Sequence, residues 1–95
     1  MHAFEDLEEG QRRELRAEYD TAASFYDKAH VRRSGGRVIL ESYGLPVAEL
    51  IGGRVYRTDE SQPESNTTAR HMREFVRQIT GIRKTTAELR DIPTI

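Results

Sequence analysis

Apolar residues recur at helical spacing between Ser65 and Gly81, and this is the clearest pattern in the chain. At this spacing the apolar residues would all lie on one face of a helix, so the pattern predicts a helix over residues 67–80. Ser65, Asn66 or Thr67 can cap its first amides, and Gly81 supplies the positive φ that ends it. A helix of this length is marginal alone in water, so it must bury its apolar stripe. The stripe consists of Ala69, Met72, Phe75, Val76 and Ile79.

The middle of the chain changes to alternating apolar and polar positions, interrupted by short glycine-rich links. This alternation is typical of strands, and links this short allow only antiparallel neighbours. The pattern predicts an antiparallel β-meander of three to four strands. The expected strands are residues 24–33, 37–43, 46–51 and 54–58, and the expected turns are residues 34–36, 44–45 and 52–53.

The front of the chain also carries a helical stripe, which predicts an N-terminal helix over residues 11–23. Acidic residues precede arginines by four positions here, as in Glu9 and Arg13, and such pairs stabilise helices. The stripe consists of Leu15, Tyr19, Ala22 and Tyr26.

An apolar sheet face must be covered, so we expect an α+β fold with helix 67–80 packed on one face of the meander. Residues 59–66 are polar and are expected to form a loop. Thr85 and Glu88 have the spacing of a capping box, which predicts a short helix from Thr86 to about Asp91. We expect a single small domain over residues 1–95, with loose ends at 1–10 and 92–95.

Composition narrows the function classes. The chain has 95 residues, 36% hydrophobic and 33% charged, with no cysteine and a net charge of −1. The missing cysteines exclude a disulfide framework and a thiolate metal site and favour the cytoplasm. No apolar run is long enough to span a bilayer, so no membrane partner is expected. The charge is uneven, at −4 over residues 1–24, +3 over 25–58 and zero over 59–95.

Candidate catalytic and metal-binding residues are few. His71 and Glu74 lie three positions apart on the predicted helix, but no second pair supplies further metal ligands. No Gly-x-Ser-x-Gly motif is present, and the Gly-Gly pairs join strands instead of opening helices. His2 and His30 are expected to be surface histidines. We therefore expect a protein without catalysis, cofactor or metal.

Arginines are the main candidates for contact with a partner. Three of them share the polar side of helix 67–80, with Arg83 and Lys84 just beyond its end. Two hypotheses follow: a nucleic-acid-binding surface, or a protein interface, where arginine is also favoured. The near-zero net charge and the few aromatic residues favour a protein partner over nucleic acid. The candidate partner-binding residues are Arg70, Arg73 and Arg77 on the helix and Arg32, Arg37, Arg54 and Arg57 on the sheet.

The segments LESYGLPVAEL, GGRVYRTDE and SNTTARHMREFVRQ resemble an uncharacterised family of short proteins encoded by phages, other mobile elements and bacteria. The resemblance covers about residues 25–80 and includes a Ser-x-Thr-Thr-x-x-His-hydrophobic-x-x-Phe motif after a β-meander. It implies structural roles: Thr67 or Thr68 caps the helix, His71 bonds near the sheet edge, and Phe75 anchors the core. Met72, Ile79 and the turn residue Tyr43 complete the expected structural set.

The resemblance implies a fold more than an activity. Composition and the arginines favour a small cytoplasmic protein-binding module, and the phage or mobile-element origin that the resemblance implies would make a host or phage protein its partner. An inhibitor such as an anti-CRISPR would fit this size and origin. Homodimerisation through an exposed strand or the front helix is a further expectation.

Overall fold

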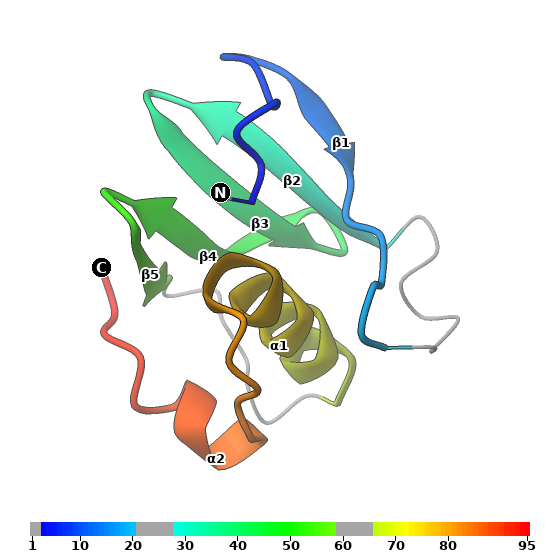
Figure 1. Ribbon diagram of the computed structural model, residues 1–95, viewed down its shortest axis with the longest axis vertical. Helices are drawn as coiled ribbons and strands as arrows, with labels where there is room; N and C mark the ends of the chain where they lie inside the picture. Colours follow the sequence, from blue (N-terminus) through cyan, green and yellow to red (C-terminus); the bar gives the residue numbers. More distant parts are fainter. Residues whose placement is uncertain (1–2, 21–27, 59–65) are drawn as a thin grey trace.

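The computed structural model describes residues 3–20, 28–58 and 66–95, which form an antiparallel sheet and two helices. Figure 1 shows α1 lying across one face of the sheet and α2 beyond it. The α+β class is therefore confirmed, with five strands where three to four were predicted. The elements are β1 (Arg12–Glu14), β2 (Ala29–Ser34), β3 (Arg37–Ser42), β4 (Leu45–Ile51), β5 (Arg54–Arg57), α1 (Asn66–Thr80) and α2 (Thr86–Leu89).

The strands follow chain order, β1-β2-β3-β4-β5, and each pairs antiparallel with the next. The β2–β3, β3–β4 and β4–β5 hairpins turn through two residues with positive φ: Gly35–Gly36, Tyr43–Gly44 and Gly52–Gly53. Two positive φ angles match the twist of the flanking strands in such short turns. The second turn begins one residue earlier than the predicted 44–45, and Tyr43 adopts φ 53° there.

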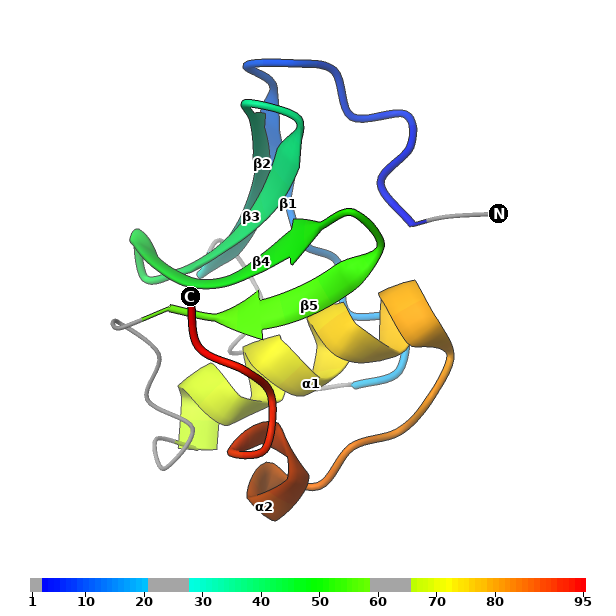
Figure 2. The same cartoon turned by 90° about the vertical axis from the view of Figure 1, so that its left-hand side faces the viewer.

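The cross-strand register separates a dry face from a wet one. Val31, Leu40 and Ala48 lie side by side on adjacent strands, and all three are buried. Figure 2 shows the curved sheet folding over α1, whose Met72 and Phe75 are fully buried. The stripe on α1 therefore packs against the sheet as its spacing predicts.

The predicted N-terminal helix over residues 11–23 is wrong. Residues 12–14 form β1, which pairs with β2, and residues 21–23 lie outside the described part of the chain. The helical stripe is not used, because Leu15 is buried while Tyr19 is 51% exposed. The backbone amides of Glu18, Tyr19 and Asp20 donate to the Glu74 carboxylate. Tertiary contacts have overridden local helix propensity.

The ends expected to be loose make defined contacts where the structure describes them. Phe4 stacks on Phe75 with ring centroids 5.5 Å apart, and Leu7 is buried. Glu9 accepts bonds from the amides of Gly36 and Gly35, which lower the pKa of its carboxyl. The predicted Glu9–Arg13 helical pair does not form, since Arg13 bonds to Asp6. At the other end, Thr94 forms a parallel bridge with Arg57 beside β5.

Both helices deviate slightly from their predicted bounds. Thr67 and Thr68 do not cap α1, because the helix begins at Asn66 and both threonines lie inside its first turn. The capping box of Thr85 and Glu88 is confirmed, and the Thr85 amide lowers the pKa of Glu88. α2 ends at Leu89, which is fully buried, two residues before the predicted Asp91.

His71 is a core residue. It is fully buried on α1, and its Nδ1 lies 2.7 Å from the Ser42 hydroxyl at the end of β3. The resemblance placed this bond near the sheet edge, whereas β3 is the central strand. Tyr43 covers the contact from the turn, with its ring centroid 5.9 Å from that of His71, and is itself exposed.

Candidate basic binding groove

A groove of about 360 Å³ runs along the outer side of α1, away from the sheet. Its walls come from three segments: α1 itself, the residues that follow β1, and the link between α1 and α2. Most of the side chains are basic. We call this feature the basic groove, and it is lined by Tyr19, Asp20, Arg70, Arg73, Glu74, Arg77, Arg83 and Lys84.

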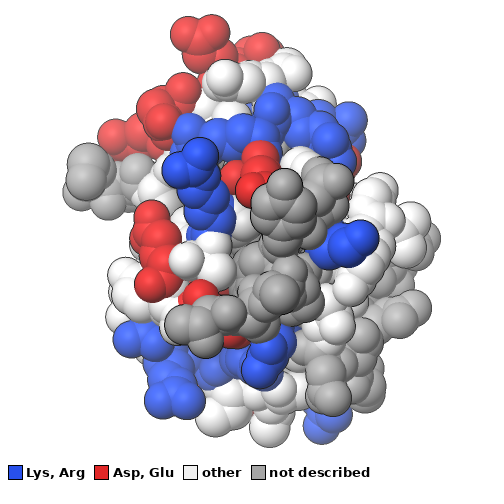
Figure 3. Space-filling model, turned by 90° about the vertical axis from the view of Figure 1, so that its right-hand side faces the viewer, with Lys and Arg blue, Asp and Glu red and all other residues white. Residues whose placement is uncertain are grey.

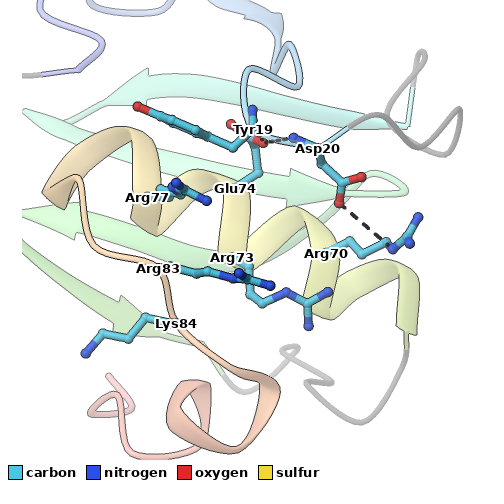
Figure 4. Close-up of a pocket in the computed structure, with 8 residues that line it drawn as sticks. All are labelled: Tyr19, Asp20, Arg70, Arg73, Glu74, Arg77, Arg83 and Lys84. Atoms are coloured by element: carbon cyan, nitrogen blue, oxygen red, sulfur yellow. Dashed lines mark hydrogen bonds and ion pairs between the residues drawn. The ribbon is translucent and has the colours of Figure 1, made fainter.

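Helix geometry and one turn bring the basic residues together. Arg70, Arg73 and Arg77 are three and four positions apart, so they share one side of α1. Gly81 then adopts φ 74° and its amide bonds to the Arg77 carbonyl, which ends the helix. Arg83 and Lys84 follow in the link to α2 and line the same groove. Figure 4 shows Arg70 and Lys84 at opposite ends of the group, with the other three arginines between them.

Glu74 closes the wall of the groove towards the front segment. Its Oε1 accepts from the amides of Tyr19 at 3.0 Å and Asp20 at 3.1 Å, and its Oε2 accepts from the Glu18 amide at 3.2 Å. Gln78 donates to the same Oε2 at 2.7 Å. Glu74 is only 3% exposed. Its buried charge is stabilised by these amide donors and not by the neighbouring arginines.

The central basic side chains are positioned by neutral groups. The Arg77 guanidinium lies 4.2 Å from the centroid of the Tyr19 ring, and Arg73 Nη1 donates to the Thr86 hydroxyl. Among the residues that the structure describes, Arg73, Arg77, Arg83 and Lys84 form no ion pair. In the described part of the chain, Arg70 is the one basic residue of the groove that faces an acid, with its Nε 3.9 Å from Asp20. The described lining holds five cations and two carboxylates, which is an excess of positive charge.

The structure divides the predicted arginines into two groups. Arg70, Arg73 and Arg77 meet in the basic groove, but the sheet arginines lie elsewhere and are mostly occupied. Arg32 pairs with Glu41 at 3.2 Å and Arg37 with Glu49 at 2.8 Å. Arg57 donates to the carbonyl of Ile92, and Arg54 is exposed at the β4–β5 turn. Figure 3 shows two separate basic areas on one face, one at the level of β1 and β2 and one at the level of α1.

Other candidate chemistry is not assembled. His71 and Glu74 have separate partners, the Ser42 hydroxyl and the amides of the front segment. Within the described ranges, no three acidic or histidine side chains are grouped to hold a metal ion. The Ser42–His71 pair is enclosed, because these residues are 3% and 0% exposed. His30 is half-buried on β2. None of the helices in the described part of the chain is long and apolar enough to cross a membrane.

Tyr19 and Asp20 belong to the groove, although no pattern in the sequence places them there. Both fall in the predicted front helix, and their contacts with α1 join residues more than 50 positions apart. Arg83 and Lys84 follow the end of the helix in the sequence, and the turn at Gly81 brings them to its side. No local pattern could have supplied these contacts.

The fold and the groove define a class: a small α+β protein with a five-stranded antiparallel sheet, a packed helix and a basic groove on that helix. Residues 13–91 match a family model described as a family of unknown function, DUF8033, and the chain belongs to that family. The match extends past the resemblance over 25–80 and includes the last two residues of β1 and all of residues 18–20, whose amides bond to Glu74. No curated protein matches the chain, and no solved structure does so either.

Proposed function

We propose that the protein is a small, non-catalytic binding module that holds an acidic segment of a partner protein in the basic groove. The observation that carries the proposal is the uncompensated charge of Arg73, Arg77, Arg83 and Lys84 within one groove. A segment of the partner that carries carboxylates would supply the negative charge that these four side chains lack. The proposal includes the cytoplasm as the compartment, and a host or phage protein, inhibited by the contact, as the partner.

A nucleic-acid partner is the second candidate, and the arrangement of the arginines favours it less. Nucleic-acid binders commonly follow the backbone over many phosphates and stack bases on aromatic rings. Here Arg32 and Arg37 on the sheet are paired with glutamates, and the basic area of the sheet is separate from that of α1, so the positive charge does not follow one continuous path. Among the described residues that line the groove, Tyr19 is the only aromatic one, and the Arg77 guanidinium already lies over its ring.

The test compares two arginines that carry the same charge but lie in different places. Arg83→Gln changes the groove, and Arg54→Gln changes the exposed β4–β5 turn. A fluorescent peptide of eight glutamates is titrated with each protein at low salt, and binding is read from anisotropy. Arg83→Gln should weaken binding by roughly three- to tenfold, about 0.7–1.4 kcal/mol, while Arg54→Gln should change it much less. Equal losses in both variants would mean that only net charge matters, and the proposal would fail.

Affinity capture from the source cell separates the two kinds of partner. Wild-type and Arg83→Gln baits are compared in lysates with and without nuclease. A protein that binds wild type in both lysates but not the variant supports the proposal. Material that is lost after nuclease treatment indicates nucleic acid instead.

A further inference from the structure

We infer that the centre of the basic groove is a site for a phosphomonoester dianion, presented by a phosphorylated side chain of the partner protein. The inference rests on the proposed function and adds the chemical group that the groove recognises. It concerns the three central arginines, Arg73, Arg77 and Arg83.

Two of these arginines are oriented before any ligand arrives. Arg73 and Arg77 are one helical turn apart, so their side chains leave α1 on the same side. Tyr19 holds the Arg77 guanidinium by ring contact, and Thr86 holds Arg73 by one hydrogen bond. Both contacts fix the guanidinium without neutralising it. A planar guanidinium held in this way offers paired N–H donors to an oxyanion.

The amount of charge favours a phosphoryl group over a carboxylate. The carboxylate of Glu74 is enclosed by three backbone amides, and Asp20 faces Arg70 at the edge of the group. The three central guanidiniums are therefore left without a counter-charge among the described residues. A side-chain carboxylate brings one charge and two oxygens. A phosphomonoester brings about −1.5 to −2 charges near pH 7 and three acceptor oxygens, so it matches the charge and the donors of three arginines better than a carboxylate does.

The rest of the groove fits the same group. Its volume of about 360 Å³ is open to solvent along α1, and its walls are almost entirely polar or charged. Lys84 adds a cation on a flexible stem at one end, where residues flanking the phosphoryl group would pass. Of the described residues in the lining, Tyr19 alone has an aromatic ring, so these walls do not match an apolar anchor.

The direct test uses inorganic phosphate as the probe and the side-chain Nε–Hε signals of arginine as the readout. Phosphate is titrated into the full chain at constant ionic strength, with acetate as the monoanion control. The signals of Arg73 and Arg77 should move saturably with phosphate, and binding should strengthen from about pH 5.5 to pH 7.5 as the dianion forms. Arg54, which lies outside the groove, should not move. Equal responses to acetate and phosphate would overturn the inference.

The partner's contribution is tested with three versions of one short acidic peptide, which carry phosphoserine, serine or aspartate at the central position. The phosphoserine peptide should bind at least roughly tenfold more tightly than the aspartate peptide, and Arg77→Gln should remove most of that difference. If all three peptides bind equally well, the groove recognises general acidity; the proposed function then survives and the phosphate site does not. If a 5′-phosphorylated oligonucleotide displaces the phosphopeptide at lower concentration, the source is nucleic acid and the inference is wrong.

Discussion

Glu74→Gln tests the contact on which the front segment depends. The substitution keeps the size of the side chain and one carbonyl oxygen, but it replaces the other oxygen by an NH₂ group. Oε1 accepts from Tyr19 and Asp20, and Oε2 accepts from Glu18 and Gln78. In either orientation of the new amide, its NH₂ group faces two N–H donors, and two hydrogen bonds are lost.

The expected loss of stability follows from these bonds. A hydrogen bond to a charged group contributes about 1.5–3 kcal/mol, and a buried donor left without an acceptor costs about 1–3 kcal/mol. Two lost bonds beside a 3%-exposed side chain should therefore lower the free energy of unfolding by about 2–4 kcal/mol. This is a large share of the roughly 5–15 kcal/mol of a small domain.

Urea denaturation followed by circular dichroism measures the loss, with Glu49→Gln as the control. Glu49, unlike Glu74, is held by an ion pair with an exposed arginine on the sheet, so its loss should cost at most about 1 kcal/mol. Hydrogen exchange at the amides of residues 18–20 locates the effect and should accelerate only in Glu74→Gln. If the free energy of unfolding of Glu74→Gln lies within about 0.5 kcal/mol of wild type, the reasoning is refuted, because two buried hydrogen bonds to a carboxylate cannot be lost at so small a cost.

Three further predictions concern the core, the buried pair and the front turn. Phe75→Ala should lower the free energy of unfolding by about 3–5 kcal/mol, because Phe75 is fully buried. The control Ile82→Ala changes an exposed residue and should alter this free energy by less than about 0.5 kcal/mol. Similar losses in both variants would show that Phe75 does not anchor the core. Ser42→Ala should lower the free energy of unfolding by about 1–3 kcal/mol, because it removes the buried hydrogen bond between the Ser42 hydroxyl and His71 Nδ1. An unchanged free energy of unfolding would argue against that bond. The amides of Gly36 and Gly35 hold the pKa of the Glu9 carboxyl below its ordinary 4.5. The ionised Glu9 therefore stabilises the fold above about pH 4.5, and this contribution disappears as the pH falls through the lowered pKa. Glu9→Gln should therefore lower the urea midpoint near pH 7, and its difference from wild type should shrink as the pH falls through the lowered pKa; a difference that grew in acid would contradict this sign.

The sequence predicts the elements whose information is local. The stripe around Phe75 predicts α1, the glycine pairs predict two of the three hairpin turns, and the spacing of Thr85 and Glu88 predicts the cap of α2. Each of these signals lies within a short stretch of the chain. The front segment fails because its helical stripe competes with contacts from far along the chain. Backbone amides that a helix would pair internally are bonded to Glu74, more than 50 residues away. A local pattern can show that Leu15 is buried, but not what buries it.

The same competition explains why the groove was only half predicted. Arg70, Arg73 and Arg77 share a helix side by spacing alone, whereas Tyr19 joins them only because the front segment is not helical. The arginines of the sheet looked equivalent in sequence. They differ in the structure because the register places Glu41 and Glu49 beside them. Whether an arginine is free to bind a partner depends on such long-range neighbours.

Glu74 links stability to binding in a way that opposes simple electrostatics. Replacing it by Gln removes a negative charge from the groove, so charge alone predicts tighter binding of an acidic peptide. The structure predicts the opposite, because losing two of the four Glu74 bonds loosens residues 18–20 and with them the Tyr19 ring that orients Arg77. We expect Glu74→Gln to bind the glutamate peptide several-fold more weakly at a temperature where it stays folded. Tyr19→Ala should show a similar loss and Tyr19→Phe very little, since phenylalanine keeps the ring face. Tighter binding by Glu74→Gln would mean that the groove acts through its net charge and that the position of Arg77 is irrelevant.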